Sequence, residues 1–337
     1  MIYTGDSLEV LPTLAPKSVH CCVTSPPYFN LRSYSGGTAE IGIEATLDCV
    51  GWATGAKCGC CFVCRLCAVF GSKAENDGVW RVLRDDGTLF VNLGDSYSGS
   101  TMTGGNKSLI KSLNQSSKPD SYMMQRQFKG AKQEKSAGLK PKDLCMAPAR
   151  FALAMQANGW YVRSDIIWSK PNPMPESVTD RPTKAHEYIF LLTKSEKYFY
   201  DADAIKEKSV SAGQTRRGGK KCSDRSQDNG LEPHNLHKYG ETPPERNCRS
   251  VWEVATKSCK EAHFAVMPIA LVTPCIRAGC PVGGTVLDPF AGSGTTGIVA
   301  MREGREFIGI ELNADYAVMA NRRVNGETPT LAELFAD

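Results

Sequence analysis

The sequence predicts an α/β protein whose mostly parallel sheet is covered by helices on both faces. Short apolar segments alternate with helical ones along the chain, as in proteins where helices connect parallel strands. The strongest example is GTVLDPFAGSGTTGIVAMREG (284–304), which has the pattern of a strand, a glycine loop and a helix. The 337 residues are enough for one large α/β domain with insertions or for two domains.

The expected elements can be followed along the chain. Residues 18–24 (SVHCCVT) indicate a short buried strand that leads into two prolines. Residues 79–95 indicate the end of a helix, an Asp-Asp-Gly turn and a strand from Thr88 to Leu93. The later elements are a helix, a stop at Gly159 and a strand in 148–172, a strand in 186–195, an amphipathic helix in 263–279, and a strand and helix in 305–324.

Two basic, glycine-containing segments interrupt this alternation. Residues 98–147 hold nine Lys or Arg against three Asp or Glu, and residues 205–262 are similarly basic. One such segment would be interpreted as a solvated loop, but two on one scaffold favour contacts with a phosphate backbone. The net charge of the whole chain is only +4, so the distribution of charge carries this inference and the total does not.

The composition also indicates the cellular compartment of the protein. No stretch reaches the ~18 consecutive apolar residues of a membrane span, and the N-terminus has no basic start followed by an apolar run. We therefore expect a cytoplasmic protein without a membrane partner. Cytoplasmic thiols stay reduced, so the fourteen cysteines are expected to bind metal or to be buried, not to form disulfides.

A cysteine cluster in residues 49–67 predicts a structural zinc site. Cys49, Cys58, Cys61 and Cys64 provide four thiolates at a spacing that suits tetrahedral zinc. A second possible set replaces Cys49 with Cys67. An iron–sulfur cluster is disfavoured because no cysteine-proline pair closes the run. The other alternative is a buried helix in which Cys61, Cys64 and Cys67 are small apolar residues at positions i, i+3 and i+6.

The glycine loop predicts a nucleoside-containing cofactor. Gly292, Gly294 and Gly297 have G-x-G-x-x-G spacing after a strand and at the start of a helix. Glu311 ends the next predicted strand, where an acidic residue can bind ribose hydroxyls. Asp288, directly before a proline, is unusual for a dinucleotide fingerprint and suggests a cofactor with an amino or cationic group.

A second motif, VTSPPYFNL (23–31), ends the strand in 18–24. Two consecutive prolines cannot donate backbone hydrogen bonds, so Pro26 and Pro27 end that strand in a rigid turn. The turn presents Ser25 and Tyr28. A packing tyrosine in a proline turn is the alternative interpretation.

TSPPY (24–28) and DPFAGSGTTG (288–297) together resemble the catalytic and cofactor motifs of S-adenosylmethionine-dependent DNA amino-methyltransferases, which methylate cytosine N4 or adenine N6. The catalytic motif precedes the cofactor motif here, as in the circularly permuted β class. TGDSLEVL (4–11) and the stretches at 181–201 and 263–272 also resemble parts of this family. The resemblance covers most of the chain except the cysteine-rich and basic segments.

The resemblance implies a Rossmann-like class I methyltransferase sheet and roles for individual residues. Ser25, Pro26, Pro27 and Tyr28 would hold the target amine, with the base flipped out of the duplex and stacked on Tyr28. Serine at position 25 slightly favours cytosine N4 over adenine N6. The residues expected to hold the cofactor are Asp6, Asp288, Phe290, Gly292, Gly294, Thr295 and Glu311.

The resemblance also divides the chain. Residues 1–97 and 148–204 would form the catalytic part, with the cysteine-rich insertion at 49–67, and residues 263–325 the cofactor part. Residues 98–147 would be a basic insertion and 205–262 the target-recognition region. The implied partners are double-stranded DNA, a second copy of the chain and a cognate restriction endonuclease, in a prokaryotic or phage-encoded system where the enzyme associates with the nucleoid.

Two other functions remain possible from the sequence. A nucleotide-dependent oxidoreductase would use the same glycine fingerprint but leaves TSPPY unexplained. A non-catalytic, zinc-stabilised DNA-binding protein would need degenerate motifs, whereas both motifs are intact here. His186, which precedes Glu187, opens a predicted strand and is interpreted as structural.

Overall fold

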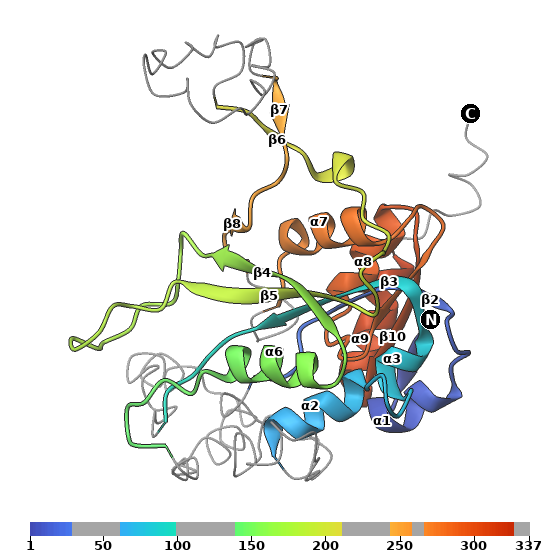
Figure 1. The fold of residues 1–337 in the computed structure, drawn as a ribbon, viewed down its shortest axis with the longest axis horizontal. Coiled ribbons are helices and arrows are strands. Elements are labelled where there is room, and N and C mark those ends of the chain that lie inside the picture. Colours follow the sequence, from blue (N-terminus) through green and yellow to red (C-terminus); the bar gives the residue numbers. More distant parts are fainter. Residues whose placement is uncertain (29–60, 99–138, 211–242, 258–265, 327–337) are drawn as a thin grey trace, which may run out of the picture.

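The computed structural model describes residues 1–28, 61–98, 139–210, 243–257 and 266–326. Eight strands form one sheet in the order β1-β10-β9-β2-β3-β5-β4-β8. The strands are β1 (Ile2–Thr4), β2 (Val19–Thr24), β3 (Leu83–Leu93), β4 (Tyr161–Ser169), β5 (His186–Thr193), β8 (Val251–Glu253), β9 (Thr285–Asp288) and β10 (Glu306–Glu311). A separate two-stranded sheet of β6 (Glu207–Lys208) and β7 (Glu245–Arg246) projects beyond the main body (Figure 1).

The sheet is mostly parallel, as the sequence predicts. β1, β10, β9, β2 and β3 pair in parallel, and β5 is antiparallel to both β3 and β4. β8 adds a parallel pair with β4 at the far edge. This last strand was not predicted, and it places part of the segment expected to recognise the target, 205–262, within the main sheet.

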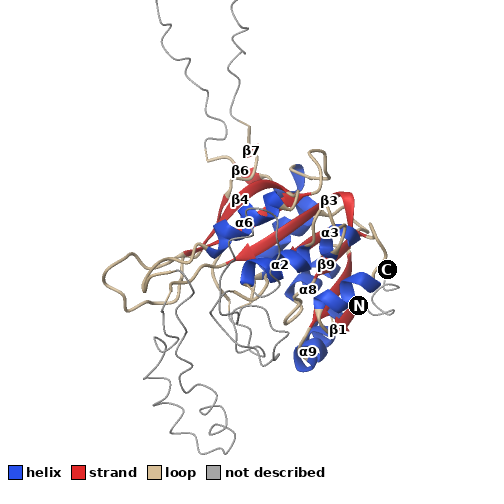
Figure 2. Cartoon of the chain, turned by 60° about the horizontal axis from the view of Figure 1, so that its bottom comes forward, coloured by secondary structure: helices blue, strands red, loops and turns tan. Residues whose placement is uncertain are grey.

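Helices cover both faces of the sheet (Figures 1 and 2). One face carries α1 (Ser7–Val10), α2 (Phe62–Phe70), α3 (Gly78–Val82) and α6 (Ala147–Ala157), and the other carries α7 (Ile269–Gly279), α8 (Thr295–Arg302) and α9 (Ala314–Asn325). Two short 3-10 turns, Leu11–Thr13 and Asp203–Ile205, complete the described elements. α9 lies beside β1 at one end of the molecule (Figure 2).

Alternation along the central strands explains the two cores. Cys22 of β2 packs into the core beneath α2 and α6, whereas Cys21 and Val23 pack into the core beneath α7 and α8. Successive strand residues point to opposite faces, so a strand with helices on both sides needs apolar residues in succession. Cys21, Cys22 and Val23 provide them in β2.

The start of β3 differs from the prediction of an Asp-Asp-Gly turn before the strand. β3 begins at Leu83 and includes Asp85, Asp86 and Gly87, so it starts five residues before the predicted Thr88. The carboxylate of Asp85 bonds Lys17 Nζ at 2.6 Å and lies 3.0 Å from Lys194 Nζ. The register of β3 with β2 shifts between Leu83 and Thr88, and its pairing with β5 starts only at Thr88, so the Asp-Asp-Gly residues form an irregular stretch of β3. Lys17 and Lys194 contact Asp85 there from outside the strands.

Candidate active site

The two motifs lie at neighbouring strand ends. β2 and β9 pair in parallel, with Cys22 opposite Leu287, so Ser25 and Asp288 emerge at the same edge of the sheet. Carboxyl ends of parallel strands are where α/β proteins bind ligands. The structure thus brings together two motifs that are separated by more than 260 residues of sequence.

Asp288 joins these two strand ends directly. Its Oδ1 accepts a hydrogen bond from Thr24 Oγ1 at 2.5 Å and one from the Phe290 amide at 3.0 Å. Its Oδ2 accepts from Thr296 Oγ1 at 2.8 Å. The carboxylate therefore braces the strand before the catalytic motif against the glycine loop. Its predicted contact with the cofactor stays a prediction.

Burial raises the pKa of Asp288 to about 6, although the Thr24 and Thr296 hydroxyls oppose that shift. Between the ordinary value of 3.8 and about 6, the folded chain holds a proton that the unfolded chain has lost. Folding stability therefore falls as pH rises through this window, by about 3 kcal/mol in total.

Asp288→Asn should remove this pH dependence because asparagine does not titrate. We expect the free energy of unfolding of the variant, relative to that of the wild type, to rise by about 1 kcal/mol between about pH 5 and about pH 7.5. Urea unfolding of both proteins at the two pH values measures the difference. A constant difference would show that Asp288 keeps an ordinary pKa.

The glycine loop has the geometry of a cofactor cradle. Gly294 has a φ of +78°, and a Cβ there would lie 3.0 Å from the Ala320 Cβ, so only glycine fits without strain. Thr295 follows at the start of α8, and its Oγ1 is buried without a hydrogen-bond partner among the described residues. A buried hydroxyl without a partner at a helix N-terminus fits a polar ligand group.

Glu311 and Asp6 complete this side of the site. Glu311 ends β10, and its carboxylate accepts the Gly292 amide at 2.8 Å and the Asn313 amide at 2.9 Å. Burial raises the pKa of Glu311. The Gly5 amide bonds the Glu311 carbonyl at 2.9 Å, which places Asp6, the N-cap of α1, next to this strand end. The structure thus gathers Asp6, Glu311 and the glycine loop at neighbouring strand ends, and their contacts with the cofactor stay predictions.

The catalytic motif is held by a polar network across four strands. Tyr28 Oη donates to Glu187 Oε2 at 2.6 Å and accepts from Asn92 Nδ2 at 2.7 Å. Ser25 Oγ is 3.4 Å from Tyr28 Oη. The Tyr28 ring packs so closely on Gly94 that a Cβ there would approach the ring to 2.6 Å. Contacts with the ring and with the hydroxyl therefore both fix the orientation of Tyr28.

Three members of this network were not predicted from the sequence: Asn92, Glu187 and Lys170. Glu187 also accepts from Asn92 Nδ2 at 3.1 Å, and its other oxygen pairs with Lys170. The available signal was the polar Asn92 in the otherwise apolar run LFVNL, because a polar residue in a buried strand needs partners. His186 beside Glu187 contacts Tyr188, in keeping with a structural role.

The cysteine cluster is only partly described. Cys49 and Cys58 lie outside the described residues, so the zinc site stays a prediction. Cys64 and Cys67 lie in α2 and Cys61 caps it, all three buried, as the buried-helix alternative expects. The described part of the chain contains no cluster of three His, Cys, Asp or Glu suited to a metal.

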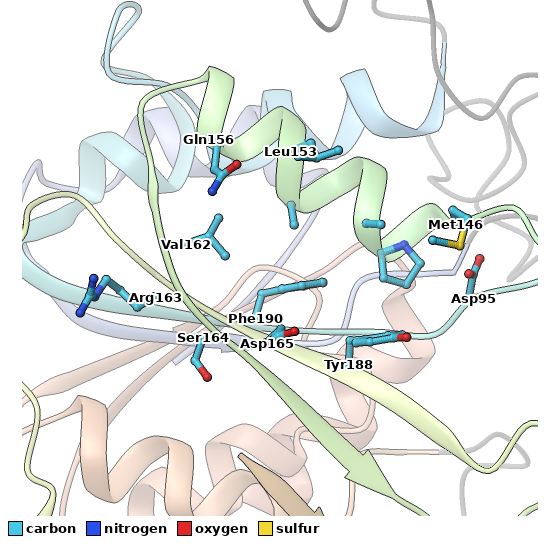
Figure 3. Close-up of a pocket in the computed structure, with 13 residues that line it drawn as sticks. Asp95, Met146, Leu153, Gln156, Val162, Arg163, Ser164, Asp165, Tyr188 and Phe190 are labelled. Atoms are coloured by element: carbon cyan, nitrogen blue, oxygen red, sulfur yellow. The ribbon is translucent and has the colours of Figure 1, made fainter. Parts of the chain in front are cut away.

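A separate pocket of about 460 Å³ lies between α6 and strands β4 and β5 (Figure 3). Phe190 and Tyr188 lie beneath the helix, with Asp95 at one end and Arg163 at the other. None of the predicted catalytic or cofactor residues lines it.

Most of the basic segment 98–147 lies outside the described residues, and so does 211–242 within the second basic segment. No described helix has the length and apolar character needed to cross a membrane.

Comparisons with known proteins identify the family of the chain. A family model described as DNA methylase matches residues 19–322. The Type II methyltransferase M.Cfr9I of Citrobacter freundii is 41% identical over 99% of this chain and 91% of its own length. M.SmaI of Serratia marcescens, also a Type II methyltransferase, is 39% identical over 96% of this chain and 90% of its own.

Solved structures show the same fold. The PvuII DNA methyltransferase (cytosine-N4-specific) has a TM-score of 0.55 at 18% identity, covering 96% of this chain and 85% of its own. TTHA0409 of Thermus thermophilus, complexed with S-adenosyl-L-methionine, has a TM-score of 0.52 at 23% identity, covering 98% of this chain and 96% of its own. The family match over most of the chain and the identity to the Type II enzymes establish that the chain belongs to the DNA methylase family of N4 and N6 amino-methyltransferases.

Proposed function

We propose that this protein transfers a methyl group from S-adenosylmethionine to the N4 amine of cytosine at a specific sequence in double-stranded DNA. The observation that carries the proposal is the Asp288 brace, which holds the TSPPY turn beside the glycine loop. Ser25 slightly favours cytosine N4, and adenine N6 is a nearly equal alternative. The oxidoreductase alternative does not account for the TSPPY turn and has no support in the comparisons.

The cofactor site is formed by the chain's own residues around β9 and β10. Glu311 and Asp6 would bind the nucleoside, and Gly294 and Thr295 would let its polar groups approach the backbone. When bound, the cofactor supplies an electrophilic methyl on its sulfonium. Methylation forms a nitrogen–carbon bond, breaks the sulfur–carbon bond and releases one proton from the amine.

The TSPPY turn would position the acceptor. The target amine is paired inside the duplex, so the base must be flipped out to be reached. Stacking on Tyr28 would stabilise the flipped base by about 1–3 kcal/mol. The Ser25 hydroxyl and the Pro26 carbonyl would accept hydrogen bonds from the amine and direct its lone pair toward the methyl group. Positioning, and not a covalent intermediate, would provide the rate enhancement.

The protein would also bind macromolecular partners. The basic segments 98–147 and 205–262 would contact phosphate and bases. The relatives named above are bacterial Type II methyltransferases, which supports a role in a restriction–modification system on cytoplasmic DNA. A cognate restriction endonuclease and a homodimer are proposals on the same basis.

Single-molecule sequencing of DNA from cells expressing this chain tests the proposal. We expect one sequence motif to carry N4-methylcytosine, and we expect this modification to be absent with a Ser25→Ala, Tyr28→Ala double variant. N6-methyladenine at one motif would correct the base only. Unmodified DNA with the wild-type chain would favour the non-catalytic DNA-binding alternative.

A further inference from the structure

We propose that Glu187 is a positioning residue for methyl transfer, acting through the hydroxyl of Tyr28. It would fix the plane of the Tyr28 ring before the target base arrives, so that the base stacks in a reactive orientation. This inference rests on the proposed function and adds a residue outside the TSPPY motif to it.

The strand pairing places Glu187 at the site. Glu187 lies opposite Trp168 in the β4–β5 pair, near the end of β4, and the β3–β5 pair sets Asn92 opposite Ile189. The ends of β3 and β4 and the start of β5 therefore meet beside the end of β2. A residue at the start of β5 can reach Tyr28 although 159 residues separate them in sequence.

The contacts of the carboxylate fix the tyrosine. Glu187 Oε2 accepts from Tyr28 Oη at 2.6 Å and from Asn92 Nδ2 at 3.1 Å, and Asn92 Nδ2 also donates to Tyr28 Oη at 2.7 Å. Gly94 packs against the ring. A tyrosine ring has two side-chain torsions, and contacts at both its carbon atoms and its hydroxyl restrict both of them.

A paired charge makes this arrangement stable. The Glu187 side chain is only 14% exposed, and an unpaired carboxylate there would lose most of its hydration. Lys170 pairs with Glu187 Oε1, and the same ammonium lies 4.4 Å from the centre of the Trp168 ring. The Lys170 ammonium therefore offsets the desolvation of the carboxylate and leaves its other oxygen directed at Tyr28.

A double-mutant cycle tests the inference. We expect Glu187→Gln to lower kcat about tenfold, because small errors in orientation reduce the rate steeply. Tyr28→Phe, which keeps the ring and removes the hydroxyl, should have a similar effect. If Glu187 acts through that hydroxyl, the double variant should be within about twofold of the single variants.

Further measurements separate positioning from folding. The KM for DNA and the Kd for S-adenosylmethionine should stay within about twofold of the wild type in Glu187→Gln, because the effect is on the chemical step. Glu303→Gln is the matched control. That carboxylate pairs with Arg277 at 2.8 Å, away from the described site residues, and its loss should leave kcat unchanged.

The possible results distinguish failure of this inference from failure of the proposed function. An unimpaired Glu187→Gln variant, or effects that multiply in the double variant, would overturn the inference and leave the proposed function intact. A weakened Kd for S-adenosylmethionine in Glu187→Gln would indicate a general structural role instead. A wild-type chain that leaves DNA unmodified would overturn the proposed function, and this inference with it.

Discussion

Tyr28→Ala should abolish methylation and leave cofactor binding intact. The change removes the stacking surface for the target base, worth about 1–3 kcal/mol. It also removes the hydroxyl that Asn92 and Glu187 hold. Misplacement of the reacting nitrogen costs roughly a further 100-fold in rate. The Glu311 carboxylate on the cofactor side of the site is held by backbone amides, and the change leaves these hydrogen bonds in place.

Two assays check this expectation. Incorporation of labelled methyl into DNA should fall by at least about 100-fold, while calorimetric binding of S-adenosylmethionine should be unchanged. Tyr161→Ala is the matched control, because Tyr161 is an exposed tyrosine at the other end of the same sheet. Retention of methylation by Tyr28→Ala would show that another residue binds the base.

Gly294→Ala should weaken cofactor binding by at least about tenfold, because it strains the loop at the start of α8. The backbone there has a φ of +78°, and the new Cβ would lie 3.0 Å from the Cβ and 3.1 Å from the Cα of Ala320. α9 cannot yield easily because Ala320 is fully buried, so the loop must move instead. Thr295 would move with it and lose its position at the helix N-terminus.

Gly283→Ala provides the control for this prediction. Gly283 has a φ of +77°, so alanine there bears the same backbone strain, about 1–2 kcal/mol, but its Cβ would have no neighbour within 4 Å. Both variants should therefore lose stability, as measured by thermal unfolding. Only Gly294→Ala should lose affinity for S-adenosylmethionine in calorimetry. Equal affinities in the two variants would contradict the role of the loop.

The central elements of the fold could be predicted from sequence because each carries a local signal. The apolar run in 18–24 required a strand buried on both faces, and β2 spans Val19–Thr24. The glycine loop between an apolar run and a helical one required a strand–loop–helix unit, and β9 and α8 form it. Prediction from local sequence fails for the edge strand β8. This strand pairs with β4, and the Trp168 indole donates to the Val254 carbonyl at 2.7 Å, but nothing near Trp168 in sequence indicates these contacts.

The sequence by itself determined the family and the two motifs, each of which follows a predicted strand. Consecutive prolines restrict the backbone and glycines permit positive φ whatever surrounds them, so such motifs can be recognised locally. Only the tertiary structure decided that Asp288 links the two motifs and that Glu187 holds Tyr28. These hydrogen bonds join residues 264 and 159 positions apart, and such pairs depend on strand order and register, which no local pattern encodes.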